Sequence, residues 1–299
     1  MSQIINELSQ SHCGDEIGLI GATGNLGGRV ARALANQGCF ARLIVRQPKK
    51  LQSSEHSIVF GDLDNPGTLP AAMKSLKCLI IITSDNPRQY AQGTSAINAA
   101  KLVGVSRIVL VSAMLAGEEV PLSFAARHAG IERELRASGI EHVILRPSFF
   151  MQSFSKFTNF KNGRMVVPVP SGSVAFVDAE DVASAVVQCA VFPLPSEVKN
   201  RTRILTGNES VSFKEAAVIL SSSVGVLVKH KSPPLFVLRC ILPWLVGRDM
   251  ASMLSYMFSR LEDGREAKPT EDLERLLGRR PKTLFECFTR EKEALVNKA

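Results

Sequence analysis

The stretch GLIGATGNLGGRVARAL, from Gly18 to Leu34, decides the fold. It begins in an apolar run, passes through Gly21, Gly24 and Gly27, and continues as a helical pattern. Glycines without a Cβ let the backbone approach a pyrophosphate, and a helix N-terminus offers free N–H groups and a positive dipole end. The order of strand, glycine turn and helix therefore predicts a dinucleotide-binding turn with GxxGxxG spacing.

Apolar strands alternate with amphipathic helices as far as Pro147. The expected strands are Glu16–Ile20, Phe40–Arg46, Ser57–Gly61, Cys78–Thr83, Arg107–Ser112 and His142–Arg146. The expected helices are Leu26–Gln37, Gly67–Leu76, Arg88–Val103 and Phe124–Ser138. Repeated β–α units predict an α/β fold, a Rossmann-type doubly wound parallel sheet whose ligand lies beyond the C-terminal ends of the strands.

After Pro147 the pattern changes to short, mostly helical segments. We expect a helix opened by Asp178 or Asp181, then a strand over 203–206, a helix over 213–222, a short strand over 226–229, and mostly helix after Pro233. Ser212 is a plausible N-cap for the helix over 213–222, with Glu215 at its third position. The chain thus divides into a flexible leader (1–15), a dinucleotide-binding domain (16–147) and a smaller, mostly helical substrate lobe (148–299) interleaved with the sheet edge.

Composition and charge narrow the classes of function. The chain has 299 residues and a formal net charge of +8, which suits nucleic acid, a membrane surface or a polyanionic cofactor. The Lys and Arg residues are dispersed and no basic run alternates with aromatics, so we expect no nucleic-acid partner. The longest apolar stretch near the C-terminus, 235–246, is interrupted by Arg239 and Pro243 and is too short for a membrane span.

The cysteines and the N-terminus indicate a compartment. None of the six cysteines forms a CxxC pair, and no His/Cys cluster has metal-ligand spacing, so we expect no metal site. Free thiols in apolar segments favour a reducing, cytoplasmic location. Residues 1–16 lack the basic and apolar regions of a secretory signal. His12, His56, His142 and His230 lie outside any motif and are expected at the surface or in turns.

The end of the second predicted strand indicates which dinucleotide is bound. NAD-binding folds place an acidic residue here for the ribose hydroxyls, but Leu43 to Lys50 contains no carboxylate. Arg46 follows Gly24 by 22 residues instead, and Lys50 lies just beyond. A guanidinium can bind a 2′-phosphate through a charge-assisted fork, so the sequence predicts NADP(H). Asp62, after the third strand, either hydrogen-bonds the adenine or caps the next turn.

Several further motifs, in the same order along the chain, resemble a known family. They are GATGNLGG at 21–28, Val45-Arg46, Phe60-Gly61-Asp62, SGIEHVILRPSFFMQSF at 138–154, DAEDVA at 178–183, Leu205-Thr206-Gly207 and LGRRP at 277–281. The chain resembles the NmrA-like atypical short-chain dehydrogenase/reductases over nearly its whole length. That family includes type 2 NADPH:quinone oxidoreductases, triphenylmethane reductases, isoflavone-reductase-like enzymes and NADP-sensing regulators without turnover.

The wider superfamily reduces carbonyls with a Ser and a YxxxK pair, and this chain departs from that pattern. Aligned on the resemblance, Phe124 stands at the Tyr position, His128 at the Lys position and Ser112 at the Ser position. Phe124 donates no proton, so the usual carbonyl chemistry is not expected. His128 either binds the nicotinamide ribose, acts as a general acid near neutral pH, or is a helix-surface histidine. Ser112 either orients substrate or ends its strand.

Together these considerations give one set of site residues. The expected cofactor residues are Gly21, Thr23, Gly24, Asn25, Leu26, Gly27, Arg46, Lys50, Asp62, Thr83, Ser84, Ser112, His128 and Pro147. Ser112 and His128 are also the catalytic candidates. The expected substrate wall is Met114, Phe124, Phe149, Phe150 and Phe154. Such a wall suits a hydrophobic or aromatic small molecule, although most of these rings, like Trp244 and its neighbours, also fit a core.

Three functions fit these features. The first is an NADPH-dependent reductase that passes hydride to an electron-poor conjugated acceptor: a quinone, an iminium or an enone-like compound. The second is a non-enzymatic NADP(H) sensor, and the third is a biosynthetic enzyme that uses the fold for a non-redox step. The protein is expected to be a monomer or a homodimer.

Overall fold

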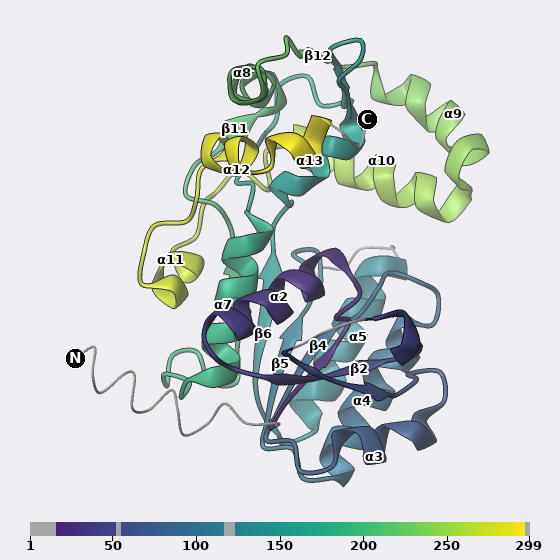
Figure 1. Cartoon of the computed structure of the whole chain (residues 1–299). Helices are drawn as coiled ribbons and strands as arrows, with labels where there is room; N and C mark the ends of the chain where they lie inside the picture. The colour runs from purple at the N-terminus through teal and green to yellow at the C-terminus, as the bar shows by residue number, and fades with distance from the viewer. Residues whose placement is uncertain (1–15, 52–54, 117–122, 297–299) are drawn as a thin grey trace. The chain divides into compact units, whose positions relative to one another are not determined.

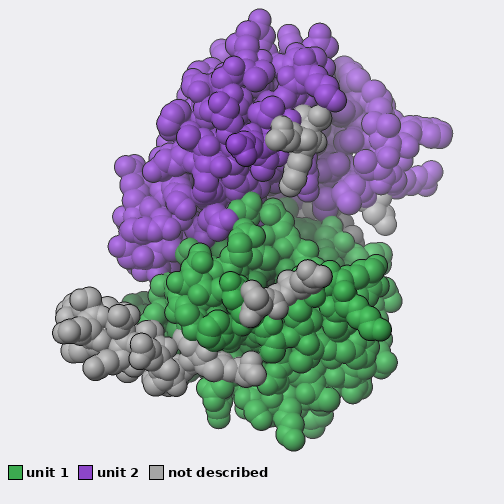
Figure 2. All heavy atoms as spheres, viewed as in Figure 1, with its two compact units in different colours: residues 1–146, 182–204 green, residues 147–181, 205–299 purple. Residues whose placement is uncertain are grey.

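A computed structural model describes residues 16–51, 55–116 and 123–296. The chain divides into two compact units, drawn in different colours in Figure 2. Unit 1 comprises residues 1–146 and 182–204, and unit 2 comprises residues 147–181 and 205–299. The chain leaves unit 1 after Arg146, returns to it over residues 182–204 and then enters unit 2 again.

A seven-stranded sheet, in the order β10-β6-β5-β4-β1-β2-β3, forms the centre of unit 1 (Figure 1). Its strands are β1 (Ile17–Ile20), β2 (Ala41–Val45), β3 (Ser57–Phe60), β4 (Cys78–Ile82), β5 (Arg107–Val111), β6 (Glu141–Pro147) and β10 (Arg201–Leu205). Neighbouring strands from β6 to β3 are parallel. The expected doubly wound α/β sheet is confirmed.

The helices of unit 1 follow the strands in the alternating order that the sequence predicts. They are α2 (Asn25–Asn36), α3 (Leu69–Met73), α4 (Gln89–Leu102), α5 (Ser123–Ala137) and α7 (Ala179–Val191), with 3-10 turns η1 (Pro48–Lys50) and η2 (Pro66–Thr68). The central strands β1 and β4 are apolar and buried along nearly their full length, as expected of strands covered on both faces. Leu79, Ile108, Ile131 and Ile144 are among the residues that join the sheet and its helices in one core.

Unit 2 is built from short elements around a core of its own. Its strands are β7 (Thr158–Asn159), β8 (Arg164–Val166), β9 (Ser173–Val174), β11 (Val211–Ser212) and β12 (Lys229–Lys231), and its 3-10 turn is η3 (Met151–Ser153). Its helices are α6 (Phe154–Phe157), α8 (Phe213–Val224), α9 (Leu235–Val246), α10 (Arg248–Glu262), α11 (Asp272–Leu277), α12 (Leu284–Arg290) and α13 (Lys292–Val296). The predicted N-cap is present, because the Ser212 hydroxyl accepts from the Glu215 N–H and the Glu215 carboxylate accepts from the Ser212 N–H.

Two predictions about local structure are wrong. The short strand expected over 226–229 runs instead over Lys229–Lys231, where it pairs in parallel with β8. His56 and His142 are buried rather than exposed. The His56 Nδ1 atom accepts from the Ala41 N–H and its Nε2 atom lies 2.9 Å from the Ala31 carbonyl, so this imidazole fastens α2 to β2.

Candidate functional site

The glycine turn between β1 and α2 leaves no room for a side chain at Gly21 or at Gly27. Gly21 has a φ of +92°, and a Cβ there would lie 2.2 Å from the Ile82 carbonyl oxygen. A Cβ on Gly27 would lie 2.0 Å from the Gly21 carbonyl oxygen, so α2 packs directly on the turn. Gly24 is the N-cap of α2 and brings no side chain to cap it. The first N–H groups of α2 are therefore available to an anion such as a pyrophosphate.

A cavity of about 670 Å³ adjoins this turn within unit 1. Its lining includes seven of the predicted cofactor residues: Gly21, Thr23, Gly24, Arg46, Lys50, Thr83 and Ser84. These residues come from the ends of β1, β2 and β4 and from the turns after them, where a ligand of a parallel sheet binds. The volume lies within the range of small-molecule sites, and two cations at its wall suit a phosphorylated ligand.

Two acidic residues after β3 have different positions. Asp62 is not among the residues that line this cavity, and its carboxylate accepts from the Asp64 N–H at 3.0 Å, which agrees with the turn-capping alternative. Asp64, which sequence reasoning missed, pairs with Arg88 at 3.0 Å and with Arg46 at 4.0 Å, and accepts from Gln92 Nε2 at 2.9 Å. Asp64 thus makes a close ion pair with Arg88, whereas the exposed Arg46 guanidinium lies at the outer limit of an ion pair with it.

A chain of hydrogen bonds leads from Thr83, in the cavity wall, to buried residues of unit 1. Arg127 Nε donates to Gln89 Oε1 at 3.3 Å, so the Gln89 amide directs its NH₂ group at Thr83 Oγ1 (3.0 Å) and at His128 Nε2 (2.9 Å). His128 Nε2 is therefore an acceptor, and the ring proton lies on Nδ1. That proton faces Ser112 Oγ at 3.5 Å. The two catalytic candidates, Ser112 and His128, are thus neighbours.

Burial keeps the His128 imidazole neutral. Loss of solvent around the ring lowers its pKa from 6.5 to about 4, and the nearby Asp85 and Glu132 carboxylates do not offset this effect. The Phe124 ring packs edge-on against it at 4.9 Å between centroids. A neutral ring whose Nε2 lone pair already accepts a hydrogen bond has no proton to give from that atom. The geometry therefore argues against the general-acid role considered for His128.

Glu132 anchors the inner end of this chain. Its carboxylate is fully buried and accepts from Ser112 Oγ at 2.6 Å, from Arg146 at 2.6 and 2.8 Å, and from Arg136 at 2.7 Å. Burial alone would raise the pKa of Glu132, but the hydrogen bonds from Arg146 and Ser112 outweigh it and hold that pKa below its ordinary value. The Ser112 proton thus points at a carboxylate, which leaves the Ser112 oxygen as an acceptor. No sequence motif singled out Glu132 for this role.

The remaining cofactor predictions lie on the same unit or at its border. Asn25 and Leu26 begin α2, where the Asn25 amide oxygen accepts from Arg29 Nε at 3.2 Å, and Pro147 ends β6. None of these three is part of the cavity lining described above, so their roles remain predictions.

The predicted substrate residues separate between the units. Met114 and Phe124 are half-buried in unit 1, and Phe149 and Phe150 are half-buried in unit 2. Phe154 is 1% exposed and packs against three other rings: Phe176, Phe213 and Phe288. The cavity between the phenylalanines of this cluster has a volume of about 10 Å³, too small for a substrate ring. Phe154 is therefore a core residue, contrary to the prediction that it lines the substrate pocket.

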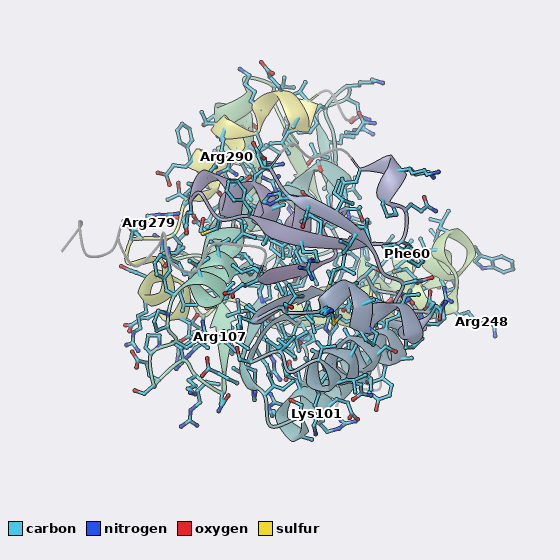
Figure 3. All side chains as sticks on the ribbon, turned by 60° about the horizontal axis from the view of Figure 1, so that its bottom comes forward. Phe60, Lys101, Arg107, Arg248, Arg279 and Arg290 are labelled. Atoms are coloured by element: carbon cyan, nitrogen blue, oxygen red, sulfur yellow. The ribbon has the colours of Figure 1, made fainter. Side chains whose placement is uncertain are left out.

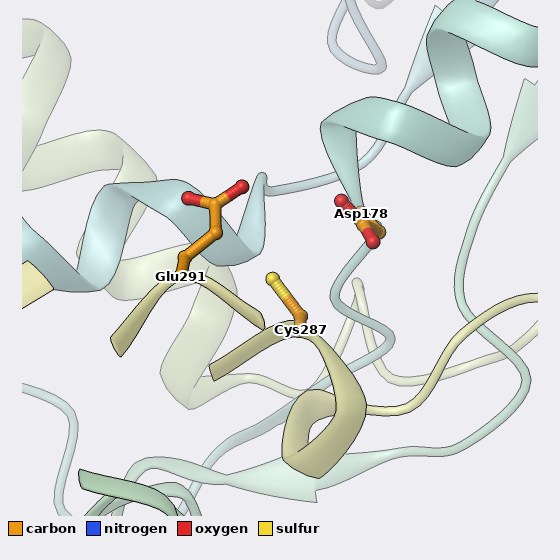
Figure 4. Close-up of side chains that lie close together, drawn as sticks. All are labelled: Asp178, Cys287 and Glu291. Atoms are coloured by element: carbon orange, nitrogen blue, oxygen red, sulfur yellow. The ribbon is translucent and has the colours of Figure 1, made fainter. Parts of the chain in front are cut away.

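A second group of titratable side chains lies in unit 2 (Figure 4). Ligand atoms of Asp178, Cys287 and Glu291 lie within 4.8 Å of one another. Arg290 donates to Asp178 at 2.7 and 3.0 Å and to Glu291 at 3.0 Å, and Gln152 Nε2 donates to both carboxylates. Burial would raise the pKa of Asp178, but the bond from Arg290 lowers it below its ordinary value. The Arg290 guanidinium compensates the charges of Asp178 and Glu291, so a structural role, linking α12 to the segment before α7, accounts for the cluster.

Comparison with known proteins finds relatives that match most of the chain, several of them named as oxidoreductases. The model of the NmrA-like family matches residues 14–294. The uncharacterized oxidoreductase YesF of Bacillus subtilis is 27% identical over 276 residues, which cover 90% of this chain and 92% of YesF. The NAD(P)H azoreductase of Xenophilus azovorans is 28% identical over 217 residues, covering 71% and 75% of the two chains.

The fold comparison agrees with the sequence comparison. The structure of the NADPH-dependent quinone oxidoreductase QOR2 of Escherichia coli, complexed with NADPH, superposes with a TM-score of 0.78 at 23% identity, over 92% of this chain and 99% of that one. The resemblance expected from the glycine turn and the later motifs is confirmed: this chain belongs to the NmrA-like family.

Proposed function

We propose that this protein is an NADPH-dependent reductase that transfers hydride to an electron-poor conjugated acceptor, such as a quinone, an iminium or an enone-like compound. The observation that carries the proposal is the cavity at the glycine turn. Its wall combines the glycine turn up to Gly24, the N-cap of α2, which suits a pyrophosphate, with Arg46 and Lys50, which suit a further phosphate. An adenine dinucleotide phosphate has both groups.

Arg46 accounts for the choice between the two nicotinamide cofactors. Its side chain is largely exposed and its only carboxylate partner among the described residues, Asp64, lies 4.0 Å away. The oxygens of a bound 2′-phosphate share a double negative charge and can approach the guanidinium more closely than Asp64 does. The phosphate therefore competes favourably with Asp64 for Arg46. A ribose without that phosphate offers no such partner. The chain therefore favours NADPH over NADH.

The polar chain through His128 restricts the acceptor. Bound NADPH supplies the hydride, and a carbonyl that becomes an alkoxide needs a proton from the protein at the same time. Phe124 has no proton to give, and His128 is neutral with Nε2 occupied by Gln89. A quinone or an iminium needs no such donor, because hydride addition gives a stabilised hydroquinone anion or a neutral amine, and the anion takes its proton from water. These acceptors fit the site better than simple ketones.

The names of two relatives support the same class of acceptor. The azoreductase and the quinone oxidoreductase described above are named for acceptors that are conjugated and electron-poor. The azoreductase is named for NAD(P)H, and the quinone oxidoreductase structure holds NADPH. The present chain is similar to both proteins and has a glycine turn that suits this cofactor.

Steady-state oxidation of NADPH in the presence of quinones, azo compounds, iminium compounds and simple ketones tests the proposal. We expect turnover with the conjugated acceptors and none with the ketones. Arg46→Ala should raise the KM for NADPH at least tenfold with little change in kcat, because it removes a charge-assisted contact far from the transferred hydride. Lys101→Ala removes the same charge from the last turn of α4 and serves as the matched control (Figure 3). NADPH binding without turnover on any acceptor would favour the sensor instead.

A further inference from the structure

Helix α9 of unit 2 exposes an unusual amount of apolar surface. Leu242 is its buried residue, whereas Trp244 is 90% exposed. Further exposed apolar side chains on α9 and at the start of α10 are Phe236, Val237, Ile241, Leu245, Val246 and Met250. A contiguous exposed apolar surface marks a contact with a partner or with lipid.

Most of the exposed apolar side chains of α9 share one face of the helix, whereas Val246 lies outside that face and Met250 belongs to α10. At about 100° per residue, an arc of about 180° collects the positions of Phe236, Val237, Cys240, Ile241, Trp244 and Leu245. Helix α9 itself packs against α10 (Figure 1). Leu242, the buried residue of α9, falls outside this arc. Arg239 also falls outside it. The exposed face is therefore apolar without interruption.

The chain around this face is basic. From Ala216 to Arg248 the sequence has no Asp or Glu, and Asp249 follows directly after Arg248. Its cations are Lys229 and Lys231 on β12, Arg239 on α9 and Arg248 at the start of α10, and all four are exposed. Figure 3 labels Arg248 where α9 passes into α10. An apolar face with basic flanks complements a surface that is both apolar and anionic.

We propose that α9 docks this protein onto an anionic lipid surface. In this position the apolar face enters the boundary between headgroups and acyl chains, and the flanking cations stay among the anionic headgroups. Trp244 suits this boundary, because an indole has an apolar body and one N–H donor.

The size of α9 determines how it lies on the lipid. Among the helices in the described ranges, none is long and apolar enough to cross a membrane. The 12 residues of α9 span about 18 Å, well short of the apolar thickness of a bilayer of about 30 Å. The helix therefore lies in the plane of the interface.

A second copy of this chain fits the same face less well. A two-fold contact brings equivalent patches together, so Lys229, Lys231, Arg239 and Arg248 of one copy would meet the same cations of the other. From Ala216 to Asp249 the sequence has four cations and a single acidic residue, Asp249, to offset them. Like charges at an interface are repulsive, whereas anionic headgroups remove the repulsion.

Fluorescence of the full-length protein tests the proposal directly, because Trp244 is the single tryptophan of the chain. The protein is mixed with vesicles of equimolar phosphatidylcholine and phosphatidylglycerol, and with vesicles of phosphatidylcholine alone. We expect a blue shift of the emission and cosedimentation with the anionic vesicles, both weakened by salt. Neither readout uses NADPH, so the result is independent of the proposed enzyme activity.

Variants separate the apolar and the charged contributions. Phe236→Ser combined with Leu245→Ser should lower partition into anionic vesicles more than tenfold, since two exposed apolar side chains no longer enter the lipid. Arg239→Gln should lower it about fivefold. Leu102→Ser changes a 75% exposed leucine of α4 in unit 1, and it should leave partition unchanged.

Three outcomes would overturn the proposal. The first is an emission spectrum that anionic vesicles do not shift. The second is unchanged partition of the double Ser variant. The third is a blue shift without lipid that grows with protein concentration, together with a doubled mass in sedimentation, which would assign the face to a second copy.

Discussion

Protonation of His128 should destabilise the folded protein at mildly acidic pH. The pKa of this side chain is about 4 in the folded state and 6.5 when it is exposed. As pH falls below 6.5, the unfolded chain binds a proton that the folded chain refuses until about pH 4. The free energy of unfolding is therefore unaffected by titration of His128 above pH 6.5, and it decreases as the pH falls toward 4.

The size of the effect follows from the same pKa difference. At about 1.4 kcal/mol per unit, the full range from 6.5 to about 4 corresponds to about 3 kcal/mol. About 2 kcal/mol of this is lost between pH 7 and pH 5. The pKa of Glu132 and of Asp178 is lowered in the folded state from ordinary values of 4.5 and 3.8. Their protonation therefore reduces the free energy of unfolding mainly below about pH 5.

Urea unfolding followed by circular dichroism at about pH 7 and about pH 5 measures this loss. His128→Gln keeps an acceptor for Gln89 but has no ionisation, so the free energy of unfolding should lose about 2 kcal/mol less over this range than in the natural chain. His230→Gln, in unit 2, leaves His128 in place and should retain the full loss. An equal decrease in the natural chain and in His128→Gln would refute the reasoning.

Two further substitutions test the turn and the buried carboxylate. Gly27→Ala places a Cβ 2.0 Å from the Gly21 carbonyl oxygen and should weaken NADPH binding more than tenfold in calorimetry, whereas Gly28→Ala, whose Cβ meets its nearest atom at 3.6 Å, should leave binding unchanged; equal affinities of the two variants would contradict this account of the turn. Glu132→Gln leaves the Arg146 guanidinium without its buried counter-charge and should cost about 3 kcal/mol of unfolding free energy in urea, and a loss below about 1 kcal/mol would count against the anchoring role.

The sequence predicts those parts of unit 1 in which local pattern and backbone requirement coincide. Gly21 and Gly27 stand where the chain tolerates no Cβ, and the strands beside them are continuous apolar runs, so the glycine turn and the sheet are readable in advance. Ser212 and Glu215 are equally local, because a capping box lies within one turn of helix.

Other features depend on contacts between distant segments. Asp64 and Arg88 form an ion pair although they are 24 residues apart, and Glu132 and Ser112 form a hydrogen bond although they are 20 residues apart. Neither spacing predicts a contact. His56 has no motif around it, yet its imidazole bridges α2 and β2. Phe154 shows the converse, since an aromatic run is compatible with either a pocket wall or a core, and only packing decides between them.

The affinity of the protein for NADPH relative to NADH, measured by titration calorimetry, tests the central claim most directly. If the cavity at the glycine turn holds the cofactor and Arg46 binds its 2′-phosphate, NADPH should bind at least tenfold more tightly than NADH, and Arg46→Ala should abolish most of that difference. Equal affinities for the two cofactors in the natural chain, or a preference that survives Arg46→Ala, would contradict it.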